Sequence, residues 1–381
     1  MPVNNNGPGI VPDIRWIVAD GTPRQRGLIH GESARHQIAS NLEIYKDWFA
    51  SFAKMAWQEA LDAADEYNHA LSKAFPSLYE EMAGIAEGSN HSLQEIGALN
   101  ARTEIAYSRV IASPGMLLPY AASECTSFAI GGDRTADGGV LVGENWDWLG
   151  SVLENSIFLH VKIGDGTELV TLTEAGMLAK FGVNSHGIVL CNNLLVSNRF
   201  QRGLTFHALS RAVLETRSLT AAMNVVANSE RAGSGNFLLA SGSTGEIVDM
   251  EWSPTHFSVL PAVDSILTHA NNFLVSPPGL VDRGQFVRNA SVGTYIRAAR
   301  AARRLQSADG RVDMGRVQAM LRDHAEYPEA ICRHAADESD ATSFGQTNAS
   351  VIYDLARQDM HWTVGPPCLG PYRGGRLPWA E

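Results

Sequence analysis

The sequence predicts an α+β protein built from stacked layers of helices and strands. Residues 24–107 carry the periodicity of helices, whereas residues 157–269 are mostly short strands separated by turns, with a helical interruption at 204–228. Helical patterns return at 287–324. Because strands come in runs between runs of helices, the order indicates packed layers and not alternating βαβ units.

The first third of the chain is predicted to be one strand followed by helices. Pro76 starts a helix, Gly88 lies near its end, and Ser92 caps the next helix. A Pro/Gly-containing linker at 113–119 then interrupts the helical pattern. The expected elements are a strand at 14–22 and helices from 24 to about 49, and at 57–74, 76–88 and 93–107.

A hairpin is predicted directly after this linker. Cys125 opens an apolar run at 127–130, which breaks at Gly131-Gly132 and resumes at 140–142, so we expect two antiparallel strands with Cys125 at an exposed start. The second strand ends in an acid and an amide flanked by two indoles, in residues 144–148. We interpret Trp146 and Trp148 as aromatic walls of a substrate-binding site.

The rest of the chain predicts short strands, helices and a closing hairpin. Strands are expected at 157–163, 168–173, 187–190, 236–240, 246–252, 256–260 and 265–269, and helices at 204–217, 219–228, 287–306 and 314–324. A last hairpin, 350–354 with 360–364, precedes a Pro/Gly-rich tail.

Composition restricts the classes of partner. The 381 residues are 45% hydrophobic and 19% charged, which suffices for a large core in one big domain or two. The net charge of -11 argues against nucleic acid or an anionic membrane as a general partner, although a local basic patch stays open. No secretion signal and no apolar run of roughly 20 residues is present, so we expect a cytoplasmic protein with no membrane partner.

Metal and disulfide chemistry is not expected. The four cysteines, Cys125, Cys191, Cys332 and Cys368, lie far apart and form no CxxC pair. No HExxH motif occurs, and no glycine loop of the phosphate-binding type is present. We therefore predict no metal and no cofactor.

Cys125 is the strongest candidate for a nucleophile. A lone cysteine is usually an inert buried residue, but this one follows a linker and the polar pair Ser123-Glu124. The local signatures of papain-like Cys/His enzymes are missing. If the Glu124–Cys125 bond were cut, the new α-amine, with a pKa of roughly 8, could act as general base for the thiol.

Several motifs together resemble the penicillin acyltransferase-like family of self-processing N-terminal-nucleophile hydrolases. The main ones are Cys125-Thr126-Ser127, the sequence GENWDW at 143–148 and THANNF at 268–273. Other stretches also agree with the family: Arg26-Gly27 together with His30-Gly31-Glu32, residues 82–88, residues 236–239 together with 245–246, and residues 350–354. The resemblance therefore spans nearly the whole chain.

This resemblance implies a four-layer αββα sandwich made from a self-cleaving precursor, or zymogen. The cut before Cys125 would leave a helical chain, 1–124, and a catalytic chain, 125–381, which remain associated and pack as one unit. The motif positions imply that Asn271 donates to the oxyanion and that Asp147 orients the amine and the nucleophile.

A catalytic arginine is also implied, at Arg297. The family's Ser-x-x-Arg is matched by Thr294-Tyr295-Ile296-Arg297, with threonine in place of serine. Each of these residues also has a structural alternative. Arg297 could lie on a solvated basic face of the helix with Arg300, Arg303 and Arg304. Asn271 could be an amide in a turn, and Asp147 could be a solvated acid at the end of a hairpin. Glu124 also replaces a glycine of the fungal member.

The leading functional prediction is a cysteine amidohydrolase that cleaves a small N-acyl amide through an acyl-enzyme on Cys125, after autoproteolysis. One alternative is an acyltransferase that moves an acyl group from a CoA-type thioester to an amine, and another is an uncleaved, non-catalytic binding protein. Hydrolysis is favoured because a chain at -11 repels the phosphates of coenzyme A. The partner is thus a small-molecule amide or thioester, and a homo-oligomer stays open.

Overall fold

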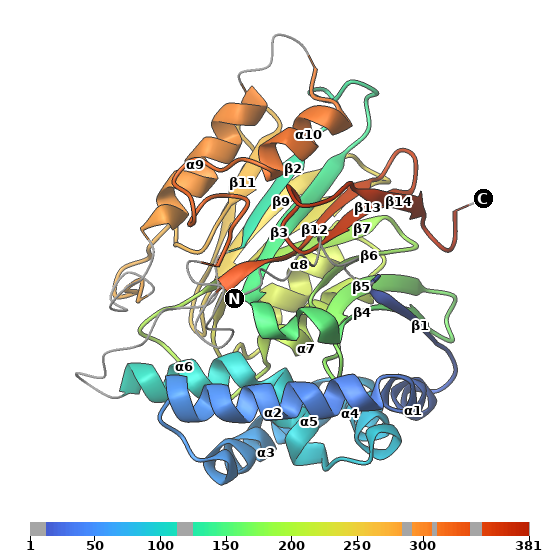
Figure 1. Ribbon diagram of the computed structural model, residues 1–381, viewed down its shortest axis with the longest axis vertical. Helices are drawn as coiled ribbons and strands as arrows, with labels where there is room; N and C mark the ends of the chain where they lie inside the picture. Colours follow the sequence, from blue (N-terminus) through green and yellow to red (C-terminus); the bar gives the residue numbers. More distant parts are fainter. Residues whose placement is uncertain (1–12, 113–124, 284–291, 307–310, 336–344, 381) are drawn as a thin grey trace, which may run out of the picture.

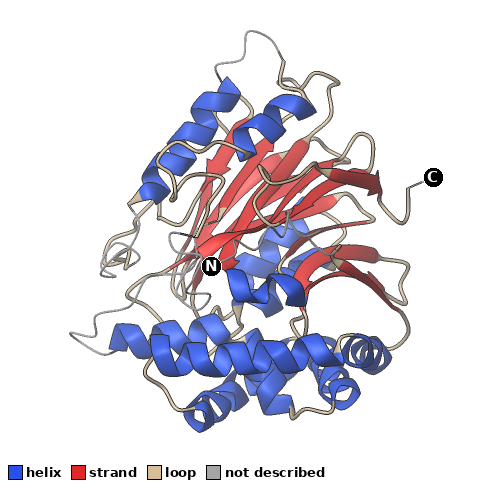
Figure 2. Cartoon of the chain, in the orientation of Figure 1, coloured by secondary structure: helices blue, strands red, loops and turns tan. Residues whose placement is uncertain are grey.

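Two β-sheets stack face to face, and helices cover the outer face of each sheet (Figures 1 and 2). The computed structural model describes residues 13–112, 125–283, 292–306, 311–335 and 345–380. Strands of one sheet lie against strands of the other, with β2 and β3 packing on β7. The predicted αββα sandwich is therefore confirmed.

The first sheet has eight strands in the order β1-β4-β5-β6-β7-β8-β9-β10. Only β1 and β4 run parallel among these neighbours, and the other pairs are antiparallel. The strand β6 was not predicted. Their bounds are β1 Arg15–Ala19, β4 Ser156–Lys162, β5 Glu168–Glu174, β6 Phe181–Asn184, β7 Ile188–Leu195, β8 Ser234–Ser241, β9 Ile247–Trp252 and β10 Phe257–Leu260.

The second sheet has six strands in the order β11-β2-β3-β12-β13-β14, all antiparallel. The predicted hairpin is β2 with β3, and both strands are buried along their whole length. The predicted tail contains one more strand, β14. The bounds are β11 Ile266–His269, β2 Thr126–Ile130, β3 Leu141–Leu149, β12 Gly345–Asp354, β13 Asp359–Val364 and β14 Arg373–Arg376.

Two pairs of helices cover the sheets. Helices α7 (Phe206–Leu214) and α8 (Leu219–Asn228) pack on β6, β7 and β8 of the first sheet. Helix α9 (Gly293–Gln306) packs on β11 and β2 of the second sheet, with α10 (Met314–Leu321) beside it. Most of the part of the predicted helix 287–306 that precedes α9 lies outside the described residues.

The remaining helices form a cluster that lies below the sheets in Figure 1. They are α1 Pro23–Ser33, α2 Arg35–Phe52, α3 Trp57–Ala74, α4 Pro76–Ser89, α5 Leu93–Asn100 and α6 Arg102–Ala112, and α2 also packs on the short 3-10 helix η1, Gly150–Asn155. The predicted helix 93–107 is two helices, broken at Ala101. The predicted linker 113–119 lies outside the described residues. No helix in the described ranges has the length and apolar character needed to cross a membrane.

Glycines allow α1 and α4 to pack backbone against backbone. A Cβ atom added to Gly27 would lie 1.9 Å from the carbonyl oxygen of Glu81, and one added to Gly84 would lie 2.2 Å from that of Arg24. Gly31 and Gly88 meet the opposite helix equally closely. Close helix packing therefore explains why glycines recur in the stretches around 27–31 and 84–88.

We predict that Gly27→Ala lowers the free energy of unfolding by roughly 1–3 kcal/mol, because the two backbones must separate to admit the methyl group. Urea unfolding of the purified protein measures the loss. The control is Gly315→Ala on α10, where the new Cβ would meet only Asp313 Oδ1, at 3.5 Å. This change should leave stability unchanged or raise it by up to about 1 kcal/mol, and equal effects of the two substitutions would contradict the packing argument.

Candidate active site

Cys125 immediately precedes β2 and is buried, with 5% of its surface exposed. The predicted exposed position is therefore wrong. The reason is that the thiol faces the space between the two sheets, where its Sγ lies 3.9 Å from the carbonyl oxygen of Asp147. Burial, followed by the nearby charges of Glu144 and Asp147, raises the pKa of the Cys125 thiol.

Arg297 reaches Cys125 from the outer face of the same sheet. Its Nη1 donates to the carbonyl oxygen of Cys125 at 2.7 Å and to Thr126 Oγ1 at 2.9 Å. Its Nη2 donates to Asn271 Oδ1 at 3.2 Å. Only 1% of Arg297 is exposed, so the alternative of a solvated basic face is wrong for this residue.

Thr294 performs the hydrogen bonding that a serine could perform at this place. Its hydroxyl accepts from the Asn271 main-chain N–H at 2.8 Å and donates to Asn272 Oδ1 at 2.9 Å. The Asn271 side chain in turn donates through Nδ2 to the carbonyl oxygen of Leu194 on β7, at 3.0 Å. Asn271 is thus held at both ends of its amide, which a simple turn residue would not require.

Asp147 faces away from the thiol. Side chains alternate along a strand, so Asp147 lies on the face of β3 opposite to Trp146 and Trp148. Its Oδ1 accepts from Thr347 Oγ1 at 2.7 Å, and the residue is fully buried. The alternative of a solvated acid is therefore wrong, and the contact with Cys125 that the described residues show is made by the main-chain carbonyl.

Trp146 and Trp148 line a small cavity together with Cys125. The cavity has a volume of ≈ 30 Å³, enough for about one water molecule or two. A larger molecule would enter this cavity only if side chains of its wall moved. The other residues of the wall are Arg102, Thr103, Lys180, Asn192, Leu194, Phe206 and His207.

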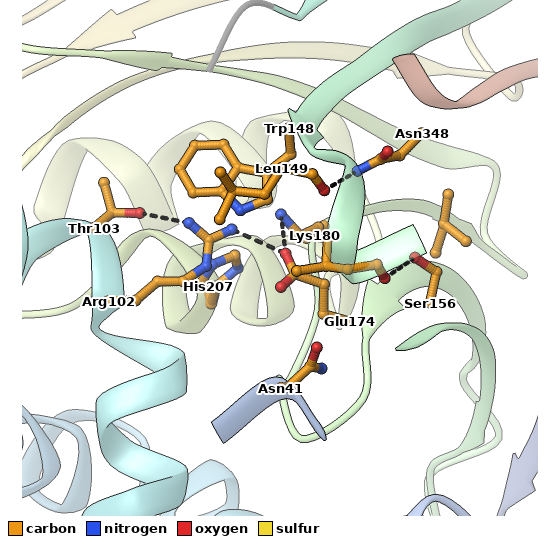
Figure 3. A network of polar contacts seen from close by, with 12 residues as sticks. Asn41, Arg102, Thr103, Trp148, Leu149, Ser156, Glu174, Lys180, His207 and Asn348 are labelled. Atoms are coloured by element: carbon orange, nitrogen blue, oxygen red, sulfur yellow. Dashed lines mark hydrogen bonds and ion pairs between the residues drawn. The ribbon is translucent and has the colours of Figure 1, made fainter. Parts of the chain in front are cut away.

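A buried ionic network in this wall was not predicted from the sequence. Glu174 Oε1 accepts from Arg102 Nη2 at 3.0 Å and from Lys180 Nζ at 2.9 Å, as Figure 3 shows. Tyr45 donates to the second carboxylate oxygen. The two cations also lie over the indoles, Arg102 at 4.1 Å from the Trp148 ring and Lys180 at 4.5 Å from the Trp146 ring.

The network makes the wall electropositive. Burial opposes the ionisation of Glu174, but Lys180 and Arg102 outweigh it and lower the pKa of Glu174 to about 2. Burial lowers the pKa of Lys180 to about 8, so this side chain still carries most of its charge at pH 7. Burial also holds the pKa of His207 well below its usual value, which keeps the imidazole neutral. Two cations thus face one carboxylate beside Cys125.

The members of this network come from α2, α6, the end of β5 and the segment before β6, so no sequence spacing connects them. In the sequence, the charged members of the network are recognisable only as single charged residues within apolar stretches.

We predict that Glu174→Gln lowers the free energy of unfolding by about 3–5 kcal/mol, because Arg102 and Lys180 then lie buried with no carboxylate between them. Denaturant unfolding followed by tryptophan fluorescence measures the change. The control is Glu87→Gln, whose ion pair with Arg24 is half exposed and should contribute at most about 1 kcal/mol. A Glu174→Gln variant as stable as this control would show that the network does not hold the wall together.

Comparison with known proteins gives a consistent assignment. Residues 134–368 match the family model described as acyl-coenzyme A:6-aminopenicillanic acid acyl-transferase. A relative from Emericella nidulans, the 40 kDa form of acyl-coenzyme A:6-aminopenicillanic-acid-acyltransferase, is 26% identical over 353 residues, which are 92% of each chain.

Two solved structures are similar more distantly. An N-acylethanolamine-hydrolyzing acid amidase ortholog from Caenorhabditis elegans has a TM-score of 0.43 and 14% identity, over 61% of this chain and 93% of its own. A mutant conjugated bile acid hydrolase from Clostridium perfringens has a TM-score of 0.45 and 12% identity, over 66% of this chain and 92% of its own. The family model alone covers more than half of the sequence, and this chain therefore belongs to the acyl-coenzyme A:6-aminopenicillanic acid acyl-transferase family.

Proposed function

We propose that this enzyme is a self-processing cysteine amidohydrolase whose nucleophile is Cys125 and whose substrate is a small N-acyl amide. Membership of the family restricts the chemistry to acyl transfer or amide hydrolysis. The observation that carries the proposal is the position of Cys125 at the head of β2, between the Arg297 guanidinium and the electropositive cavity.

Maturation would supply the base that the intact chain lacks at Cys125. In the uncut chain the nitrogen of Cys125 is part of a peptide bond and cannot accept a proton. His207, which lines the same cavity, is held neutral, but its Nδ1 donates to the carbonyl oxygen of Ala179 at 2.9 Å and burial lowers its basicity. Cleavage after Glu124, a residue outside the described ranges, would create an amine with a pKa of roughly 8 beside the thiol.

The proposed reaction then follows in two steps. The new amine takes the thiol proton and the thiolate attacks the amide carbonyl, which forms a tetrahedral oxyanion. Asn271 would donate a hydrogen bond to that oxygen through its amide nitrogen, and Asp147, whose side chain faces away from the thiol, would orient the new amine. Collapse transfers the proton to the leaving amine and leaves a thioester on Cys125, which water hydrolyses to the free acid. The positive charge of Lys180 partly offsets the burial that disfavours the thiolate of Cys125.

The two products of cleavage would remain associated. Strand β1 pairs with β4 across the proposed cut, and buried ion pairs join Arg102 to Glu174 and Glu81 to Arg211. Separation of the chains would also expose the apolar core that Phe49 and Leu99 share with Trp148 and Leu172, at a high free-energy cost. The N-terminal chain would thus contribute Arg102 and Thr103 to the active-site wall.

We predict that the purified protein separates into a fragment ending at Glu124 and one beginning at Cys125, as measured by intact-mass analysis under denaturing conditions. Cys125→Ala should remain at full length because the bond is cut through the thiol. The control is Cys191→Ala, which removes another buried cysteine and should still permit cleavage. Wild-type protein that remains at full length after prolonged incubation would instead favour the uncleaved binding protein.

The arginines of α9 bear on the choice between hydrolysis and acyl transfer. Arg297 is buried against Cys125, and Arg300 and Arg304 both pair with Asp323. The single carboxylate of Asp323 offsets one of these charges, which weakens the attraction of α9 for the phosphates of a coenzyme A thioester. They support hydrolysis as the main reaction, while the name of the fungal relative supports acyl transfer as the second candidate.

We predict that water is the usual acceptor of the acyl group. The matured enzyme is given an N-acyl amide, then an acyl thioester with a competing amine, and free acid is measured against new amide by mass spectrometry. Free acid should dominate with both donors, and Arg303→Glu should leave thioester use unchanged. If new amide dominates at modest amine concentration, and this charge reversal weakens thioester use alone, the enzyme is an acyltransferase.

A further inference from the structure

Two cysteines and two histidines meet on the outer side of the second sheet. They are His324, Cys332, His334 and Cys368, and their ligand atoms all lie within 4.8 Å of one another. Three of them follow α10, and Cys368 lies between β13 and β14. Cys332 is buried and His324 is exposed, so the cluster lies at the surface with one side open.

We propose that these four residues form a structural zinc site. Zinc bound tetrahedrally, at about 2.3 Å from sulfur and about 2.0–2.1 Å from nitrogen, places its ligand atoms roughly 3.3–3.8 Å apart. The Nε2 atom of His334 lies 3.1 Å from His324 Nε2, 3.3 Å from Cys368 Sγ and 3.7 Å from Cys332 Sγ. These separations agree with the tetrahedral values within a few tenths of an ångström.

Hydrogen bonding alone does not account for this arrangement. An imidazole nitrogen has either one hydrogen or one lone pair in the plane of its ring. His334 Nε2 can therefore form a proper hydrogen bond with one of its three neighbours and not with all of them. A single cation between the four atoms would bind every one of them at once.

The backbone around the cluster is fixed by bonds that do not involve the four side chains. The Cys332 N–H donates to the carbonyl oxygen of Asp323 at 3.0 Å. Arg322 donates through Nε to the carbonyl oxygen of Pro367 at 2.8 Å and through Nη2 to that of Gly370 at 3.2 Å. These contacts hold the chain segment of Cys368 against that of His324, which reduces the entropy lost when a metal binds.

The donor set favours zinc. Two thiolates and two imidazoles in a tetrahedron are typical of Zn²⁺, whereas Mg²⁺ and Ca²⁺ require oxygen ligands. Four protein ligands leave no open position for a substrate, so the role is structural and not catalytic.

The zinc site would stabilise the segment that supports β3. Ile331, next to Cys332, accepts a hydrogen bond at its carbonyl oxygen from Asn145 Nδ2, at 2.8 Å. The main-chain N–H of Arg333 donates to Thr347 Oγ1, and this hydroxyl donates to Asp147. A cation bound by Cys332 and His334 would thus fix the adjacent residues Ile331 and Arg333, which make these hydrogen bonds.

The first test measures metal content in protein produced without a histidine tag and purified without a metal column. We expect about one zinc per chain by mass spectrometry of the elements. His324→Ala and Cys368→Ser should each lose the zinc, whereas His69→Ala, which removes an exposed histidine on α3, should retain it. Wild-type protein with less than about 0.1 zinc per chain, both as purified and after addition of zinc under reducing conditions, would overturn the proposal.

The second test needs no variant and does not depend on enzymatic activity. Cobalt exchanged into wild-type protein should give the strong visible absorption of a tetrahedral Co²⁺ site and the near-ultraviolet bands of thiolate ligation. A disulfide is the competing explanation for the two cysteines. Peptide mapping after thiol alkylation would reveal a Cys332–Cys368 crosslink, and that crosslink in place of the cobalt bands would refute the zinc site.

Discussion

The shared carboxylate of Glu174 is the interaction on which the site depends most. It lies between Arg102 from the N-terminal helices and Lys180 from the first sheet, and it neutralises part of the charge of both. Burial of two cations beside Trp146 and Trp148 is tolerable only because this oxygen binds them both. The wall of the cavity beside Cys125 thus requires residues from both sides of the proposed cleavage point.

Cys125, the proposed nucleophile, is held by groups from both sides of the second sheet. Its side chain points inward, to the cations and indoles between the sheets, while its carbonyl oxygen is held by Arg297 from the outer helix. Asn271, which follows β11, links Arg297 to Leu194 on β7 of the first sheet, and Asp147 on the outer face is held by Thr347. The proposed zinc site extends this outer support, because it lies next to the residues that bind Asn145 and Thr347.

Much of the fold follows from local patterns. Helices 57–74 and 219–228 were predicted with the bounds that the structure has, because apolar residues recur with helical spacing in both, Pro76 follows the first and Ser218 caps the second. The strand β6 was missed since four residues carry too little alternation to predict a strand. The split at Ala101 was missed because neither glycine nor proline marks it.

The sequence by itself determined the α+β class of layered fold and the β2–β3 hairpin, because these depend on local periodicity, and its short motifs pointed to Cys125, Asp147, Asn271 and Arg297 through their resemblance to a family. Only the tertiary structure decided that Cys125 is buried, that Arg297 contacts it, and that Arg102, Glu174 and Lys180 meet beside it. The same holds for the meeting of His324, Cys332, His334 and Cys368, whereas the distant cysteines and the missing HExxH motif had predicted no metal. Contacts between residues far apart in sequence arise from the packing of layers, and this packing leaves no regular spacing in the chain.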